Sequence, residues 1–178
     1  MLKLIKLVVG YLEANCYVIF DQNSKDAVII DPGDEAEKII LEIVKNKLKP
    51  YAILNTHNHF DHTGANNEIK QKLNIKIYRP EKDEEIKKFG SLSELKFLLT
   101  PGHTRDGLCI LVEGHLFSGD TLFASSVGRT DLAGGDFNQL TNSIKTKILA
   151  LPEDTIVHPG HGPDTTIEAE KKSNPFLI

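Results

Sequence analysis

The sequence predicts a mixed α/β fold in a single domain, because short apolar strand runs alternate with amphipathic helical stretches and both halves of the chain repeat this scheme. The strand runs are rich in Val and Ile and are separated by turn residues. A length of 178 residues is enough for one sizeable core, so one domain is expected over residues 1–178. Strand runs followed by helices favour two sheets packed face to face with helices outside.

The first half is expected to open with three strands, over residues 4–9, 16–20 and 27–30. A helix is then predicted over residues 34–47, with Asp34 as its N-cap and Pro50 barring its continuation. The apolar stripe of this helix is formed by Ile39, Ile40, Ile43 and Val44.

Four further elements complete the first half. A short buried strand at residues 51–54 delivers a histidine cluster, a helix covers residues 65–73 and a strand follows at 75–78. Residues 81–89 are predicted to form a charged, exposed helix.

The second half is expected to repeat the scheme around one amphipathic helix over residues 137–149, which places Leu140, Ile144 and Ile148 on one face. Each predicted strand leads towards a possible ligand residue. These strands cover residues 95–99, 108–112, 115–117 and 155–157.

Composition and charge exclude several classes of protein. The hydrophobic fraction is 40% and the net charge is −4, with lysines scattered over the chain, which argues against a nucleic-acid surface. Lys3 and Lys6 interrupt the apolar N-terminal run, so neither a signal peptide nor a membrane helix is expected. Cys16 and Cys109 lie in strand-like apolar runs and are predicted to be core residues rather than a disulfide. A cytoplasmic protein without a membrane partner is expected.

The most informative motif is a cluster of acidic and imidazole side chains after the strand at 51–54. It reads His-X-His-X-Asp-His, and three further candidates follow Gly or Pro-Gly turns. A lone His-X-His pair is a weak signal, whereas agreement of all these positions favours a metal site. The seven candidates are His57, His59, Asp61, His62, His103, Asp120 and His161.

The chemistry of these side chains suits two adjacent cations. Imidazole binds zinc, iron and similar metals, and carboxylate oxygens also accept harder ions. Two cations about 3.5–4 Å apart, sharing such ligands, activate water for hydrolysis. The reaction then needs no Ser or Cys nucleophile.

The chain resembles the metallo-β-lactamase superfamily and, within it, the glyoxalase II-like hydrolases. The resemblance covers nearly the whole chain. It is carried by Asn15-Cys16-Tyr17-Val18, Ile30-Asp31-Pro32-Gly33-Asp34, the histidine cluster, Pro101-Gly102-His103-Thr104, Ser118-Gly119-Asp120-Thr121, Gly128-Arg129-Thr130-Asp131, Pro159-Gly160-His161-Gly162-Pro163 and Asn174-Pro175-Phe176. The resemblance implies a four-layer αββα sandwich.

The resemblance also implies a ligand set for two divalent ions. One ion would be held by His57, His59 and His103, and the second by Asp61, His62 and His161, with Asp120 bridging both. Zinc is the default metal, and iron or manganese would also fit these ligands.

The implied function is a metal-dependent hydrolase that cleaves a small thioester or ester with metal-activated hydroxide, with Asp61 and Asp120 as catalytic residues. Glyoxalase II carries a C-terminal helical domain that binds glutathione, and this sequence ends soon after His161. Lactoylglutathione is therefore expected to be a poor substrate.

Three alternatives to this function stay open. A mono-iron persulfide dioxygenase shares the Gly-Arg-Thr-Asp segment. A tRNA-processing nuclease is disfavoured by the lack of a basic patch, and a non-catalytic metal-binding module by the complete ligand set.

Five residues near the motifs also need an interpretation. Asp31 is expected either to orient a ligand histidine or to cap the following turn, with neither favoured. Arg129 is expected to pair with Asp131 rather than to bind an anionic substrate group. The remaining three are expected to have no metal role: Asp106 as a surface charge, His115 as an exposed hairpin residue and His158 as a packing residue.

Overall fold

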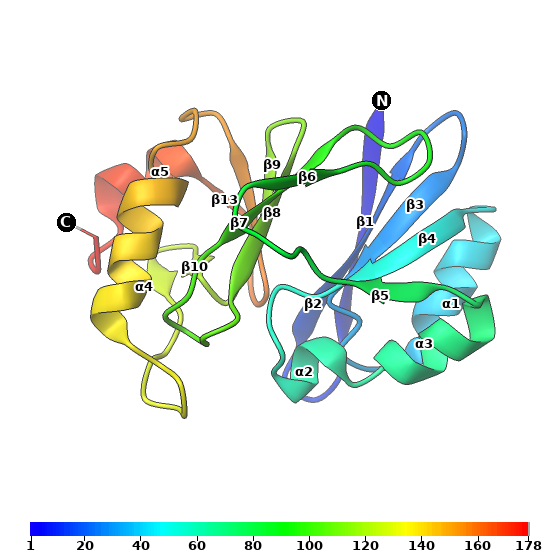
Figure 1. The fold of residues 1–178 in the computed structure, drawn as a ribbon, viewed down its shortest axis with the longest axis horizontal. Coiled ribbons are helices and arrows are strands. Elements are labelled where there is room, and N and C mark those ends of the chain that lie inside the picture. Colours follow the sequence, from blue (N-terminus) through cyan, green and yellow to red (C-terminus); the bar gives the residue numbers. More distant parts are fainter. Residues whose placement is uncertain (178) are drawn as a thin grey trace. The chain divides into compact units, whose positions relative to one another are not determined.

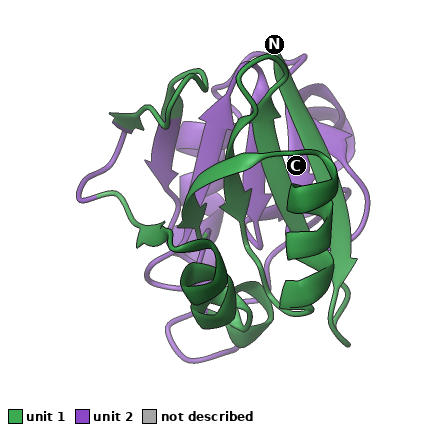
Figure 2. Ribbon diagram, turned by 90° about the vertical axis from the view of Figure 1, so that its right-hand side faces the viewer, with its two compact units in different colours: residues 1–55, 59–80, 86–95 green, residues 56–58, 81–85, 96–178 purple. Residues whose placement is uncertain are grey.

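The computed structural model describes residues 1–177 and divides into two compact units. Unit 1 comprises residues 1–55, 59–80 and 86–95, and unit 2 contains the rest (Figure 2). The boundary runs through the histidine cluster, because residues 56–58 belong to unit 2 and His59 to unit 1.

Unit 1 is a five-stranded sheet with the strand order β1-β2-β3-β4-β5. The first three strands are antiparallel neighbours, whereas β4 runs parallel to β3 and β5 runs parallel to β4. The strands are β1 (Leu2–Val9), β2 (Ala14–Asp21), β3 (Asp26–Ile30), β4 (Lys49–Leu54) and β5 (Lys76–Tyr78). The helices are α1 (Ala36–Lys45), α2 (Phe60–Thr63) and α3 (Asn66–Leu73).

The core of unit 1 lies between this sheet and two of its helices. Ile39 and Ile43 of α1 and Ile69 of α3 pack in one buried cluster with alternate residues of the strands, such as Val18 and Ile29. Both helices therefore cover the same face of the sheet, as Figure 1 shows. This burial explains why β3, which joins the hairpin to the parallel strands, is apolar from Ala27 to Ile30.

Most of the second sheet, which has the order β13-β12-β9-β8-β7-β6, belongs to unit 2, together with a separate hairpin of β10 and β11. β8 and β9 form an antiparallel hairpin, and β12 runs parallel to β9. The strands are β6 (Glu85–Lys87), β7 (Leu95–Leu99), β8 (Leu108–Val112), β9 (His115–Gly119), β10 (Leu122–Phe123), β11 (Ser126–Val127), β12 (Ile156–Pro159) and β13 (Thr165–Thr166). The helices are α4 (Phe137–Ser143), which continues as a π-helix over Ile144–Ile148, and α5 (Ile167–Ser173).

The core of unit 2 confirms the predicted stripe of its long helix. Leu140, Ile144 and Ile148 are fully buried and pack with residues from the sheet, such as Cys109 and Val157. The last turn of this helix is π-helical rather than α-helical. The sequence periodicity did not predict this change of winding.

The predicted helix over residues 81–89 is wrong. This segment forms a turn followed by the short edge strand β6. Glu84 has a left-handed backbone (φ 58°), which ends any helix there. The side chain of Asp83 accepts a hydrogen bond from the Leu99 amide at 2.8 Å and pairs with Lys147, so tertiary contacts override the helical propensity of the charged residues.

The first helix also differs in detail from its prediction. It begins at Ala36 after Glu35, so Asp34 is not its N-cap. Asp34 instead accepts a hydrogen bond from the Glu35 amide at 2.7 Å. Val44, expected in the apolar stripe, is 65% exposed. Among residues 1–177 no helix combines the length and the hydropathy needed to cross a membrane.

Candidate metal centre

The predicted ligand cluster follows β4 as a tight turn and a one-turn helix. His59 occupies the N-cap position of α2 with an extended backbone, and Asp61 and His62 lie within that helix. The Asp61 Oδ2 atom is 3.7 Å from Nε2 of His62, which is fully buried. Unit 1 therefore brings together two of its three predicted ligands, and His59 begins the same helix.

The ring of His62 is held from its other side. Its Nδ1 atom lies 3.1 Å from Oδ2 of Asp31, a buried carboxylate at the end of β3. A carboxylate can only accept this hydrogen bond, so Nδ1 carries the proton and Nε2 presents its lone pair. Of the two interpretations left open for Asp31, the structure supports the orienting one.

Glycine allows α2 to lie against the loop after β3. A Cβ atom on Gly33 would lie 1.6 Å from the carbonyl oxygen of Asp61, and one on Gly64 would lie 2.3 Å from the carbonyl oxygen of Gly33. Only residues without a side chain fit these positions. The Pro-Gly turn therefore sets the position of the helix that carries Asp61 and His62.

Unit 2 brings together four predicted ligands, one carboxylate and three imidazoles. Oδ2 of Asp120 lies 3.6 Å from Nε2 of His103 and 3.8 Å from Nε2 of His161. The ring of His57 packs edge-on against that of His103, with 4.9 Å between centroids. Asp120 is thus placed between two imidazole Nε2 atoms, as a shared ligand requires.

Two of these histidines are also oriented through Nδ1. The Nδ1–H group of His103 donates to the backbone carbonyl of Arg129 at 2.7 Å, and Nδ1 of His57 hydrogen-bonds the Thr56 hydroxyl at 3.1 Å. Partners of this kind fix the tautomer and the ring plane of metal-binding histidines. Neither partner was predicted from the sequence. A backbone carbonyl leaves no side-chain signature, whereas Thr56 could have been found from its place beside His57.

Tight backbone contacts support this arrangement as well. A Cβ atom on Gly128 would lie 1.9 Å from the carbonyl oxygen of Asp120 and 3.1 Å from Cβ of His103. Gly119, with a left-handed backbone (φ 50°), would clash with Thr56 at 2.2 Å. The Gly residues before and after Asp120 therefore let its turn approach the other ligand segments.

The donor set fits a divalent cation. Two ligands that each bind one tetrahedral ion at ~2.1 Å lie about 3.4 Å apart. The Nε2–Oδ2 separations of 3.6, 3.7 and 3.8 Å are close to this value and exceed ordinary hydrogen-bond lengths. Imidazole and carboxylate ligands indicate divalent-metal binding and leave the choice among zinc, iron and manganese open.

Several residues outside the ligand set lie differently from their predictions. His115 is only partly exposed, and its Nδ1 lies 2.9 Å from Nε2 of the buried His158. Asp106, expected on the surface, is half-buried.

Arg129 forms the predicted pair with Asp131 through two hydrogen bonds of 2.7 Å. Both of these side chains are largely exposed, so the pair stabilises the loop and does not neutralise a buried charge.

Both cysteines are buried free thiols, which confirms their prediction as core residues. Burial raises the pKa of the Cys16 thiol far above its ordinary value, and the Asp31 carboxylate adds to this effect. Cys16 is therefore unsuited to act as a nucleophile or as a thiolate ligand.

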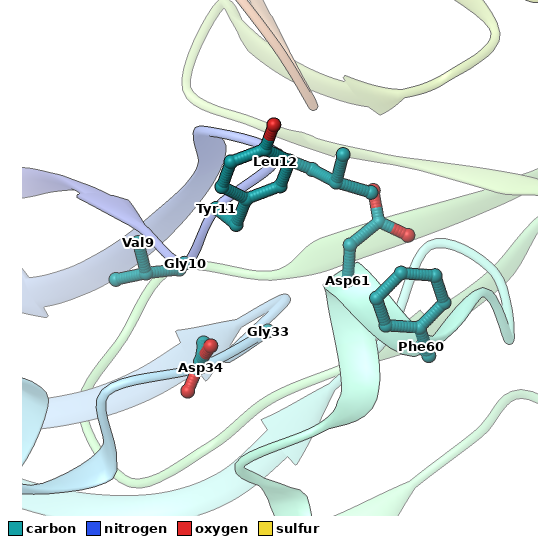
Figure 3. Close-up of a pocket in the computed structure, with 8 residues that line it drawn as sticks. All are labelled: Val9, Gly10, Tyr11, Leu12, Gly33, Asp34, Phe60 and Asp61. Atoms are coloured by element: carbon teal, nitrogen blue, oxygen red, sulfur yellow. The ribbon is translucent and has the colours of Figure 1, made fainter.

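A small pocket lies next to Asp61 within unit 1 and has a volume of about 160 Å³. Figure 3 shows Phe60 and Asp61 at the start of α2 opposite the turn that carries Tyr11 and Leu12. The side chains of Tyr11 and Phe60 are 98% and 73% exposed. The full lining consists of Val9, Gly10, Tyr11, Leu12, Gly33, Asp34, Phe60 and Asp61.

Comparison with known proteins identifies the family. The sequence matches the Metallo-beta-lactamase superfamily over residues 9–92 and 87–161. It is 37% identical to the hydroxyacylglutathione hydrolase GloC of Haemophilus influenzae, covering 93% of each protein. It is 35% identical to the probable metallo-hydrolase YqgX of Bacillus subtilis, covering 97% of this chain and 96% of that protein.

Solved structures with the same fold include three with clear sequence similarity. The BLEG-1 B3 metallo-beta-lactamase has a TM-score of 0.92 at 36% identity, with 99% of this chain and 100% of that chain covered. TTHA1623 in a di-iron-bound form has a TM-score of 0.88 at 35% identity and coverages of 97% and 100%. ETHE1 from Myxococcus xanthus has a TM-score of 0.90 at 27% identity and coverages of 97% and 83%. These matches confirm the α/β metallo-β-lactamase fold expected from the sequence.

Proposed function

Because the chain belongs to the metallo-β-lactamase superfamily, we propose that it is a metal-dependent hydrolase of small thioesters or related esters. The proposed centre binds two divalent ions through seven side chains. These are His57, His59, Asp61, His62, His103, Asp120 and His161. The observation that best supports it is the orientation of ligand histidines through Nδ1, by Asp31 in unit 1 and by the Arg129 carbonyl in unit 2.

The assignment of ligands to ions follows the resemblance and is part of the proposal. His57, His59 and His103 would hold the first ion, and Asp61, His62 and His161 the second. Asp120 would bind both, which agrees with its placement near Nε2 of both His103 and His161. The two sets share one segment of chain, because His59 of the first set and Asp61 of the second are only two residues apart.

Bound divalent ions of this kind lower the pKa of water towards neutrality and polarise a substrate carbonyl. The protein supplies the positioning. Asp31 and the Arg129 carbonyl keep the Nδ1 protons of His62 and His103 in place, so that Nε2 faces the centre. Asp61 and Asp120 provide the negative charge that balances cations in a partly buried site.

The pocket beside Asp61 supports a small, uncharged acyl group as the substrate part bound there. Its lining is largely aliphatic and aromatic, and its only ionisable acidic side chains are Asp34 and Asp61. An anionic group would be repelled by Asp34, whereas an apolar group would gain from contact with Leu12 and Phe60. A volume of about 160 Å³ accommodates an acyl group of a few carbon atoms.

The test of this function is turnover by the metal-replete protein on a panel of thioesters, lactones, phosphodiesters and a persulfide. We expect hydrolysis of thioesters with small acyl groups, and loss of this activity after chelation. Full metal occupancy without turnover on any substrate of the panel would instead indicate a non-catalytic metal-binding module.

A mono-iron persulfide dioxygenase is the second candidate. The Gly-Arg-Thr-Asp segment at Gly128–Asp131 favours it, and the similarity to ETHE1 leaves this activity open. Oxygen uptake with a persulfide, together with a single iron per chain, would support this candidate over the hydrolase.

The proposal also includes a cytoplasmic location and a small-molecule substrate rather than a nucleic acid or a membrane. The two buried free thiols are compatible with a reducing compartment. The net charge of −4 disfavours binding to polyanions.

A further inference from the structure

A chain of three hydrogen-bonded side chains lies in unit 2 outside the seven proposed ligands. Oδ2 of Asp164 lies 2.8 Å from Nδ1 of His158, and Nε2 of His158 lies 2.9 Å from Nδ1 of His115. His158 is 3% exposed and its ring stacks on Phe117, with 4.9 Å between centroids and 24° between planes. A buried imidazole with both nitrogens in short hydrogen bonds is held in one orientation.

The positions of these residues connect them with a proposed ligand. β12 and β13 pair as an antiparallel hairpin in which Val157 faces Thr165. His158 directly follows Val157, and Asp164 directly precedes Thr165. The loop between His158 and Asp164 carries His161. Their hydrogen bond therefore closes the base of the loop beyond the last backbone pair.

The polarity of the hydrogen bond is fixed by its partners. The Asp164 carboxylate only accepts, so Nδ1 of His158 carries a proton, and in the neutral imidazole Nε2 accepts from Nδ1–H of His115. The hydrogen bond to Asp164 therefore fixes the orientation of the His158 side chain. The second hydrogen bond, from His115, is not needed to fix the tautomer of His158.

Two glycines flank His161 in this loop. Gly160 donates to the carbonyl of Gly119 at 2.8 Å, which ties the loop to the residue before Asp120. Gly162 has a left-handed backbone (φ 73°), and a Cβ atom there would meet no neighbour within 4 Å. His161 itself is 29% exposed. A loop containing two glycines needs side-chain anchors to hold an imidazole in place.

We propose that His158 and Asp164 are positioning residues for His161: their hydrogen bond closes the loop and holds the His161 imidazole next to Asp120. This inference rests on the proposed function only in naming a metal as what His161 binds. The closure of the loop is a property of the chain itself and can be measured without metal.

The experiment uses the full chain with four substitutions. Asp164→Ala and His158→Phe remove the closing bond, and the Phe variant keeps a ring for stacking. Asp164→Asn keeps an acceptor for Nδ1–H and is the conservative rescue. His115→Ala removes only the outer bond and is the matched control.

The first readout is hydrogen–deuterium exchange of the metal-free protein in peptides that contain Gly160. We expect faster exchange there in Asp164→Ala and His158→Phe, with rates close to wild type in Asp164→Asn and His115→Ala. Unchanged exchange in both disrupting variants would overturn the proposal, whatever number of ions the protein binds.

The second readout is competition for Zn²⁺ with a chromophoric chelator. We expect Asp164→Ala and His158→Phe to weaken the second zinc equivalent about tenfold to hundredfold and to leave the first nearly unchanged, as for other residues that orient metal ligands. Equal weakening of both equivalents would indicate general destabilisation and would overturn the positioning role. Binding of one equivalent by the wild type would contradict the binuclear centre instead, and the exchange measurement would then decide the role of the pair.

Discussion

Asp31 accepts a hydrogen bond from Nδ1 of His62 at 3.1 Å, and both side chains are almost completely buried. Asp31 also has a left-handed backbone (φ 50°), a conformation that costs free energy for a residue with a Cβ atom. Its backbone amide bonds the Leu54 carbonyl at 3.0 Å, which ties the turn after β3 to the strand that leads into the ligand cluster. The strained turn is therefore held where its carboxylate meets His62.

Asp31→Ala should weaken the ion bound by His62 about tenfold to hundredfold, because the imidazole loses the group that fixes its tautomer and plane. Chelator competition on the purified variant measures this change. Asp154→Asn, which alters an exposed carboxylate outside the proposed centre, is the control and should bind metal as the wild type does. Equal affinities for wild type and Asp31→Ala would mean that the hydrogen bond only stabilises the turn.

The ligand pattern was visible in the sequence because four of the seven ligands stand within six residues and the other three each follow a Gly or Pro-Gly turn. Their supports were less visible. Asp31 could be noticed but not interpreted, since a carboxylate after a strand can cap a turn equally well. The Arg129 carbonyl could not be predicted at all, because every residue has one, and its place near His103 depends on tertiary structure.

The secondary-structure predictions show the same contrast between features that a sequence pattern reveals and features that depend on tertiary contacts. Buried elements such as β8 and the helix from Phe137 were predicted closely because their apolar periodicity reports burial. Helix α2 has four residues, fewer than the periodicity needs, and was missed. Residues 81–89 were mistaken for a helix because their charged composition does not reveal the contacts of Asp83 with Leu99 and Lys147.

Two ions per chain should bind to the reconstituted protein, because seven imidazole and carboxylate ligands exceed what one tetrahedral ion uses. Elemental analysis after gentle reconstitution with zinc, iron or manganese measures this ratio. A firm plateau at one ion, with a strong preference for iron, would move the assignment to the dioxygenase.

Asp120→Ala should lose at least one ion and nearly all hydrolysis, because its carboxylate lies near Nε2 of both His103 and His161. His115→Ala should lose neither, since its nearest polar partner is His158 rather than a proposed ligand. Metal content and turnover are compared on the two variants prepared together. Similar behaviour of the two would mean that the assignment fails at Asp120.

The Arg129–Asp131 pair should contribute to stability only above the acidic range. Hydrogen bonds from Arg129 lower the pKa of Asp131 to about 2, below the ordinary value of a carboxyl. A group with a lowered folded-state pKa stabilises the protein above its unfolded pKa, and the contribution fades as the pH falls from about 4 to about 2. Both side chains are exposed, so the effect is small and salt-sensitive.

Thermal midpoints of wild type and Asp131→Asn at pH 7 and pH 2.5 test this sign. The difference between the two proteins should shrink at pH 2.5 and in high salt. A difference that grows on acidification would contradict the pairing as the source of the lowered pKa.

If the protein is the proposed hydrolase, the pocket beside Asp61 should make it prefer uncharged, apolar acyl groups. A series of thioesters with one thiol and different acyl groups tests this on the wild type and on Phe60→Ala. Contact with an acyl group that covers roughly 60 Å² of apolar surface is worth about 1.5 kcal/mol, which corresponds to about a tenfold change in kcat/KM. Phe60→Ala should therefore lose about this much for a butyryl-type thioester, and little for an acetyl one.

A succinyl-type substrate should be poor with both proteins, because its carboxylate would approach Asp34. Phe137→Ala, which removes an exposed ring outside the pocket lining, is the matched control and should not change the order of the substrates. A preference of the wild type for the succinyl substrate would show that the acyl group binds elsewhere on the protein.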